Sequence, residues 1–263
     1  MSDAAAHLSG MQAVWARLRS FSENDAPLDF VLIWDHLDRF MLGAWLTLEI
    51  TFLALLAGGL LAVPLAFAGS SSKVWLRWPV AGYSYVFRGT PLLVQLYLIY
   101  YGRAQFDAVR SSWLWDPFLS KAWWCAFFAF TLNTCAYTVE ILRGAIVNTA
   151  RGELEAARAC GMNWLLRARR IVLPGALRRA LPAYGNEVIF MLHGSVVLST
   201  VTLQDVLGVG RWLNGRYYLA YEGFITAMLF YMAIVFVVTQ ALRILERRWY
   251  MHLPAATPLP NRN

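Results

Sequence analysis

Long apolar runs, separated by shorter polar and basic stretches, organise this chain. About 20 mostly apolar residues cross a hydrocarbon core of ~30 Å, and five runs reach that length. They cover residues 43–68, 84–102, 122–146, 184–204 and 223–242. Arg88, Gly89 and Pro91 stand at the start of the second run, so we expect that helix to begin broken or shortened. The pattern predicts an all-α polytopic membrane protein.

The two ends of the chain differ from the apolar region between them. From Phe30 to Phe40, apolar residues alternate with charged ones in a roughly helical period, which indicates an amphipathic segment in the membrane interface. No basic stretch precedes a short apolar core, so we expect no cleaved signal peptide. We therefore expect an N-terminal extension over 1–40, a membrane domain over 41–250 and a disordered, proline-containing tail over 251–263.

Composition and charge support a membrane protein with a defined orientation. Of 263 residues, 59% are hydrophobic and only 15% are charged, unlike a soluble protein. A net charge of +7 would suit nucleic acid, but the basic residues gather after the first, third and fifth runs. Lys and Arg concentrate in cytoplasmic loops. With an odd number of spans, the N-terminus is then outside and the C-terminus inside.

The sequence carries no pattern for chemistry of its own. Cys125, Cys135 and Cys160 have no CxxC spacing and number one too many to pair, which argues against a disulfide scaffold or a zinc site. We expect them to be packing residues. No Gly-x-x-x-x-Gly-Lys-Ser/Thr stretch forms a phosphate loop, and the four histidines are scattered. We predict no catalytic residue and no metal ligand.

The longest connection, about 147–183, has a helical pattern of its own. Residues 153–171 are good helix formers that Gly161 divides into two short helices, and Pro174 and Pro182 are expected to mark the far side of the loop. A basic, partly amphipathic element under a membrane has two interpretations. It can be a solvated or lipid-hugging loop, or a docking element for a soluble partner.

A short motif in this connection favours the docking element. Glu155, Ala156 and Ala157 are followed after three residues by Gly161, and after nine more by Ile171, Leu173 and Pro174. This spacing resembles the signature loop of permease subunits of ABC importers, with every fixed position matched. The resemblance implies that the loop forms coupling helices, which sit in a cleft of a cytoplasmic ATPase and transmit its closure to the spans.

The resemblance extends over roughly residues 43–250. It is carried by Phe87–Gln95, Leu132–Tyr137, Glu140, Arg143–Ile146 and Leu181–Glu187. These stretches are similar to the polar amino acid branch, and within it to the membrane subunits of histidine, lysine, arginine, ornithine and opine importers. Many relatives have Lys-x-Thr-Ser-Leu in the fourth span, whereas this chain has the stretch His193–Val197, and the histidine-type subunits also begin it with His.

The resemblance implies a type I ABC importer transmembrane domain in a bacterial inner membrane. Such a permease moves an amino acid inward, here a cationic one or an opine. The expected partners are a cytoplasmic ABC ATPase dimer, a second and paralogous permease subunit and a periplasmic substrate-binding protein. No cofactor is expected in this chain, since ATP and magnesium would bind the partner ATPase.

Polar residues inside the spans are candidates for a translocation path, because they are costly in lipid. Asn133, Tyr137 and Glu140 share one face of the third span, and Asn186 and His193 share one face of the fourth. These two stripes could face each other across a pathway.

The alternative is that these residues hold helices together, with Glu140 paired to Arg143 one turn away. Glu187 lies near the inner end of the fourth span. Glu49, near the outer end of the first span, can either reach the interface harmlessly or attract a cationic substrate.

Two other classes of protein remain as rivals. A self-contained secondary amino acid transporter would need an internal repeat, and five spans cannot form an equal inverted duplication. A membrane enzyme would need clustered catalytic groups.

Overall fold

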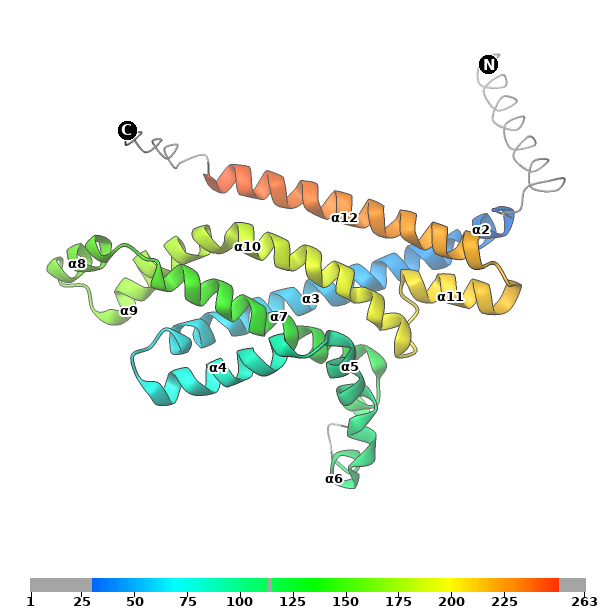
Figure 1. Cartoon of the computed structure of the whole chain (residues 1–263), viewed down its shortest axis with the longest axis horizontal. Coiled ribbons are helices and arrows are strands. Elements are labelled where there is room, and N and C mark those ends of the chain that lie inside the picture. The colour runs from blue at the N-terminus through cyan, green and yellow to red at the C-terminus, as the bar shows by residue number, and fades with distance from the viewer. Residues whose placement is uncertain (1–29, 113–114, 251–263) are drawn as a thin grey trace, which may run out of the picture. The chain divides into compact units, whose positions relative to one another are not determined.

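The computed structural model describes residues 30–112 and 115–250, and within these ranges the ordered elements are helices, with no strand. Contacts divide the chain into two compact units, Met1–Glu49 with Val196–Ile234 and Ile50–Ser195 with Val235–Asn263. The α-helices are α2 (Val31–Asp35), α3 (Leu37–Gly69), α4 (Val74–Gly89), α5 (Leu92–Tyr100), α6 (Asp107–Arg110), α7 (Ala122–Val147), α8 (Arg151–Ala159), α9 (Trp164–Arg167), α10 (Leu173–Gly194), α11 (Val206–Tyr217) and α12 (Ala220–Tyr250) (Figure 1). The expectation of an all-helical chain is confirmed for these ranges.

Within residues 30–112 and 115–250, three helices are long and apolar enough to cross a membrane on their own. They are Leu37–Gly69, Ala122–Val147 and Ala220–Arg248. They contain the first, third and fifth predicted spans. The second and fourth predicted spans fall on shorter or more polar helices, so the count of five spans and the orientation of the termini stay predictions.

The second predicted span is broken, as its sequence indicates. Helix α4 ends at Gly89 and α5 begins at Leu92, with Pro91 between them. The residue before a proline is pushed out of the helical region, and Thr90 has φ −113° and ψ 142°. Helix α4 nevertheless begins at Val74, ahead of the apolar run, because a polar residue such as Arg77 lowers hydropathy without preventing a helix.

The helix that contains the start of the fourth predicted span begins earlier in the chain than the sequence pattern indicates. Helix α10 begins at Leu173 and ends at Gly194, after which Ser195–Thr200 continue as a 3-10 helix. The two prolines that were expected to mark the far side of the loop, Pro174 and Pro182, do not interrupt α10. Pro174 lies in the first turn, where no backbone donor is needed. Pro182 lies in the interior, where it removes one hydrogen bond without ending the helix.

The segment predicted to be amphipathic is helical in two parts. Helix α2 ends at Asp35, and the rest forms the first turn of the long helix α3. Phe40 is fully buried and its ring stacks on Phe230 at 5.3 Å, so part of the apolar pattern packs against protein. Its position in a membrane interface stays a prediction. Residues 1–29 and the predicted tail over 251–263 lie outside the described part of the chain.

The first unit is organised around the buried carboxylate of Asp205. One oxygen accepts the backbone N–H of Gly208 at 2.8 Å and caps α11, and the other accepts the Tyr231 hydroxyl at 2.7 Å. Gly43 of α3 lies against the Asp205 backbone, where a Cβ would be 2.8 Å from the carbonyl carbon. Burial raises the pKa of Asp205 to about 6, although these hydrogen bonds lower it. Asp205 thus connects α3, α11 and α12.

The second unit is built on α7, which contacts α4, α5 and α10. Figure 1 shows α8 and α9 beyond one end of α7, and α6 beyond the other end. Small residues bring α3 close to α7: a Cβ on Gly58 would lie 2.5 Å from Cγ2 of Thr134. Alanines continue this close packing, with Ala62 and Ala66 of α3 in the same buried cluster as Ala176 of α10.

Two of the three cysteines are packing residues, as expected. Cys125 and Cys135 are buried in α7. Cys160 is exposed instead, because it is the C-cap of the short helix α8 and lies before the turn at Gly161. The prediction that all three cysteines pack in the interior is therefore wrong for Cys160.

Candidate functional site

The helix break at Pro91 is closed by buried side-chain amides. Proline has no N–H, so the Phe87 carbonyl one turn earlier lacks its normal helical donor. The Gln95 amide donates to that carbonyl at 2.7 Å, and the Asn133 amide of α7 donates to it at 3.2 Å. Because an unpaired buried carbonyl is costly, these two amides stabilise the break.

Gln95 also connects the other groups around the break. Its Nε2 donates to the carbonyl and the hydroxyl oxygen of Thr90 at 3.0 and 2.8 Å, and its Oε1 accepts from Asn133 Nδ2 at 3.0 Å. Both amide side chains are buried. Sequence reasoning did not select Gln95 as a functional residue, although a glutamine four residues after a proline in an apolar run was the available signal.

Tyr137 continues the polar face of α7 toward α4. Its hydroxyl donates to the Arg88 carbonyl at 3.4 Å, and the Arg88 guanidinium lies 5.3 Å from the ring centroid, within cation–π range. Glu140, one turn further, accepts Arg143 Nη2 at 2.8 Å and Nε at 3.0 Å. The Glu140–Arg143 pairing considered from the sequence is therefore present.

The structure does not bring the two predicted polar stripes together. Asn133 and Tyr137 point to α4 and α5, whereas Asn186 and His193 of α10 are exposed. The contact between α7 and α10 uses a different pair, in which Glu187 accepts the Thr134 hydroxyl at 3.1 Å. Adjacent residues on a helix point about 100° apart, so Asn133 and Thr134 reach different neighbours.

Glu49 occupies neither stripe. It lies on α3 and is half-buried. Its side chain was predicted to reach the interface or to attract a cationic substrate, and both interpretations stay predictions.

A polar cavity of about 400 Å³ lies between α4 and α7. We call it the arginine recess and define it by Arg77, Ser84, Arg88, Glu140 and Arg143, which line it. Three of these side chains are cationic and one is anionic. Of the polar face predicted on α7, Glu140 lines this cavity and Asn133 and Tyr137 do not, and the opposite wall comes from α4 and not from α10.

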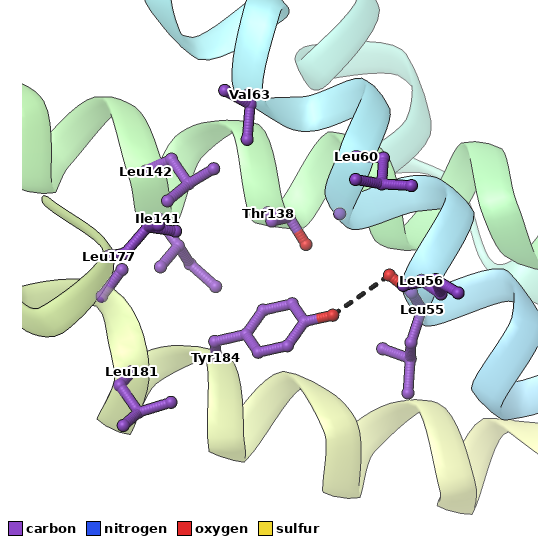
Figure 2. Close-up of a pocket in the computed structure, with 12 residues that line it drawn as sticks. Leu55, Leu56, Leu60, Val63, Thr138, Ile141, Leu142, Leu177, Leu181 and Tyr184 are labelled. Carbon is purple, nitrogen blue, oxygen red and sulfur yellow. Dashed lines mark hydrogen bonds between the residues drawn. The ribbon is translucent and has the colours of Figure 1, made fainter. Parts of the chain in front are cut away.

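A second cavity, of about 330 Å³, lies between α3, α7 and α10 and is almost wholly aliphatic. Figure 2 shows Leu55 and Leu56 opposite Leu177 and Leu181, with the Tyr184 hydroxyl donating to the Leu55 carbonyl at 3.1 Å. Its lining includes no Asp, Glu, Lys, Arg or His side chain, and Tyr184 and Thr138 supply its only side-chain hydroxyls. This pocket suits hydrocarbon, so the arginine recess is the better candidate for a zwitterionic ligand.

The predicted coupling loop forms two short helices divided at Gly161, as expected. Helix α8 ends at Ala159, and Gly161 follows with φ +73°, a left-handed conformation that favours glycine. Asn163 then caps α9 by accepting the Leu166 N–H at 2.8 Å. Of the motif residues in α8, Glu155 and Ala156 are exposed and Ala157 is buried.

The far half of the motif continues directly into α10. Ile171 lies in a π-helix, Ala168–Val172, and Leu173 and Pro174 form the first turn of α10. Arg179 of α10 then reaches back to the end of α7. Its guanidinium donates to the Ala145 carbonyl at 3.1 and 3.2 Å and to the Thr149 hydroxyl at 2.8 Å. One side chain therefore joins α7, the start of the loop and α10.

Comparison with known proteins identifies what the chain resembles. Residues 51–250 match the family described as "Binding-protein-dependent transport system inner membrane component". The octopine transport system permease protein OccM of Rhizobium meliloti is 40% identical over 220 residues, which are 84% of this chain and 89% of that protein. The histidine/lysine/arginine/ornithine permease HisM of Salmonella typhimurium is 42% identical over 222 residues, 84% of this chain and 94% of that protein.

Solved structures agree with this likeness. A chain from an amino acid ABC transporter crystallised with histidines has a TM-score of 0.73 and 31% identity, covering 85% of this chain and 100% of that chain. A chain of the MetNI methionine ABC transporter has a TM-score of 0.68 at 18% identity, covering 82% and 98%. The second likeness extends to the fold alone.

The amide closure of the helix break leads to a testable expectation. Replacing Gln95 with Ala removes the donor to two carbonyls, so we expect the free energy of unfolding to fall by about 2 kcal/mol. Asn133→Ala should cost less, and the double variant should deviate from additivity by about 1 kcal/mol because both amides serve the Phe87 carbonyl. The measurement is SDS-induced unfolding in mixed micelles, followed by fluorescence. Gln105→Ala, on an exposed side chain, is the control and should unfold like the unaltered protein. Strictly additive effects of Gln95→Ala and Asn133→Ala would contradict the idea that both amides satisfy the Phe87 carbonyl.

Proposed function

Because the chain belongs to the family of binding-protein-dependent transport system inner membrane components, it is the membrane permease of an ABC importer, and we propose that it moves cationic amino acids or opines inward. The observation that carries the substrate class is the level of identity, 40–42%, to permeases named for octopine, nopaline and histidine/lysine/arginine/ornithine transport. The family match makes a self-contained secondary transporter the weaker alternative.

The proposed complex has four kinds of component. A cytoplasmic ABC ATPase dimer binds ATP and magnesium, a periplasmic protein delivers the amino acid, and a second, paralogous permease completes the membrane pathway beside this chain. Closure of the ATPases pushes the coupling loops together and switches the spans from inward to outward facing. ATP hydrolysis then resets them, so ATP shifts a two-state equilibrium of the permease pair.

In this proposal the membrane domain over 41–250 crosses the bacterial inner membrane five times. The N-terminal extension over 1–40 begins outside, and the tail over 251–263 lies in the cytoplasm. The clustering of basic residues after the first, third and fifth runs supports this orientation. The broken helix α4–α5 and the predicted span over 184–204 supply the other two crossings.

We assign two sets of residues to this function. The coupling loop uses Glu155, Ala156, Ala157, Gly161, Ile171, Leu173 and Pro174. The exposure of Glu155 and Ala156 on α8 supports a docking role, since these side chains are available to a partner. The candidate path uses Glu49, Asn133, Tyr137, Glu140, Asn186, Glu187 and His193, of which Glu140 lines the arginine recess.

Uptake by the assembled importer tests the function. Proteoliposomes that contain the ATPase, both permeases and the binding protein should take up arginine, lysine or histidine only when ATP is present on the side of the membrane that carries the ATPase. Glu140→Gln should lower this uptake several-fold while basal ATP hydrolysis changes little, because an anionic wall group would be lost. Asp107→Asn, on an exposed α6 side chain, is the control. Uptake of glutamate or glutamine alone would end the cationic assignment and leave the permease assignment standing.

Gly161 has a left-handed backbone conformation, so coupling can be tested with substitutions that differ in how well they tolerate that conformation. No atom lies within 4 Å of a Cβ at this position, so a side chain meets strain and not a clash. Gly161→Val should abolish ATP-driven uptake while the protein still inserts and copurifies with its partner permease. Asn tolerates the left-handed region, so Gly161→Asn should retain most uptake. Equal uptake by the Val variant and the unaltered protein would count against the coupling loop.

The exposed thiol of Cys160 provides a native probe of orientation. Cys125 and Cys135 are buried, so a charged maleimide should react mainly with Cys160. We expect no labelling in intact spheroplasts and strong labelling in inverted vesicles stripped of the ATPase. A cysteine introduced at Ser111, beyond the other end of α7, should behave in the opposite way. Labelling of Cys160 from outside the cell would reverse the proposed topology.

A further inference from the structure

We propose that the arginine recess binds the carboxylate end of the transported amino acid, with Ser84 and Arg88 of α4 as the binding residues. The inference rests on the proposed function in one respect, namely that the ligand is the importer's cargo. It differs from the expectation drawn from the sequence, in which acidic residues attract the cationic end. In this proposal the recess recognises the α-carboxylate, which every amino acid shares.

The charge of the recess is not balanced by its own residues. Arg143 is paired with Glu140 at 2.8 Å. Arg77 and Arg88 line the same cavity without an ion pair there, and the Arg88 guanidinium rests on the Tyr137 ring. Guanidinium groups match carboxylates with paired hydrogen bonds. Glu187 of α10 interacts electrostatically with Arg88, but no hydrogen bond joins the two. Arg77 and Arg88 are eleven residues and so about 16 Å apart along α4. An anionic group deep in the recess would therefore meet the Arg88 guanidinium, with Arg77 nearer the start of α4.

Ser84 is the second, independent sign of a ligand. It lines the recess, is only 3% exposed, and its hydroxyl has no hydrogen-bond partner. A buried hydroxyl without a partner costs roughly 1–3 kcal/mol, so the position is unfavourable unless something else completes it. The oxygen itself is buried, and rotation about the Cα–Cβ bond would turn it toward an anion held by Arg88, one turn further along α4. A carboxylate oxygen would supply the missing acceptor.

The depth of the recess favours cargo over a phospholipid. The Tyr137 ring beside Arg88 lies about 15 Å along α7 from its last residue, Val147, at 1.5 Å per residue. The hydrocarbon core is ~30 Å thick and phosphate groups lie outside it. Arg77, in the first turn of α4, is within reach of a lipid phosphate, but Arg88 is not. A ligand that reaches Arg88 must therefore enter the membrane interior.

The two unpaired arginines also bear on which cargo is preferred. An amino acid such as arginine brings one carboxylate, whereas octopine is arginine with a carboxyethyl group on its α-nitrogen and brings two. Arg88 and Ser84 would bind one carboxylate, and the second carboxylate of an opine would add charge attraction to Arg77, which lines the same recess. We therefore expect binding to rise with the number of carboxylates, from agmatine with none, through arginine with one, to octopine with two.

Binding to the membrane complex without the binding protein tests the site directly. The complex of both permeases and the ATPase, in nanodiscs, is titrated with radiolabelled arginine or octopine, and with agmatine as competitor. Agmatine at a 100-fold excess should displace little arginine, and octopine should bind at least as tightly as arginine. Arg88→Gln should raise the Kd for both carboxylate ligands about tenfold or more, and Ser84→Ala several-fold.

Two controls separate recognition from folding. Ser84→Ala removes a hydroxyl that has no partner, so its melting temperature should stay the same or rise while the affinity falls. A purely structural serine would leave the affinity unchanged. Arg110→Gln removes an arginine of α6 that does not line the recess and should bind as the unaltered complex does.

Other outcomes overturn the inference. Unchanged affinity in Arg88→Gln and Ser84→Ala, with normal ATP-driven uptake, would refute the carboxylate site while the proposed function stands. Equal binding of agmatine and arginine, or no saturable binding by the unaltered complex, would refute it as well. Native mass spectrometry tests whether a phospholipid occupies the recess instead. An anionic phospholipid that copurifies with the complex and is lost in Arg77→Gln, while amino acid binding is unchanged, would assign the recess to lipid. Failure of uptake in every condition would instead reject the proposed function.

Discussion

The scarcity of hydrogen-bond donors in a membrane is the constraint on which the second unit depends. Inside hydrocarbon no water can serve a backbone carbonyl, so each break in a helix must be satisfied by protein. Pro91 creates such a break, and Gln95 and Asn133 satisfy it with amide donors to the Phe87 carbonyl. Because one donor comes from α7, the position of α5 relative to α7 follows from the chemistry of the break.

The same break shapes the arginine recess. A continuous helix from Val74 to Tyr100 would run as a single rod, whereas the interruption ends α4 at Gly89 and turns its last carbonyls toward α7. The Tyr137 hydroxyl donates a hydrogen bond to the Arg88 carbonyl, and the Arg88 guanidinium lies over the Tyr137 ring. The polar residues of the third predicted span therefore serve two purposes, since the contacts that satisfy the backbone also hold an arginine at the cavity.

Sequence patterns predicted features that depend on neighbouring residues and missed those that depend on distant ones. The break at Pro91 and the turn at Gly161 follow from the backbone of single residues, so both were predictable. The starts of α4 and α10 were not, because Arg77 and Arg179 lower local hydropathy and Pro182 reads as an end. The structural role of Gln95 depends on its hydrogen bond with Asn133, 38 residues away. No local sequence pattern predicts that contact.

Arg179 gives the chain a mechanical property. It fastens α10 to the end of α7 and to Thr149, just before α8, so α10 is held near its cytoplasm-proximal end in the proposed orientation. Arg179 is the seventh of the 22 residues of α10, so about 22 Å of helix separates it from Gly194. A rigid pivot of about 5° at Arg179 would move Gly194 by about 2 Å. Helix α10 can therefore act as a lever, in which a small displacement at the loop is enlarged at Gly194 by length alone.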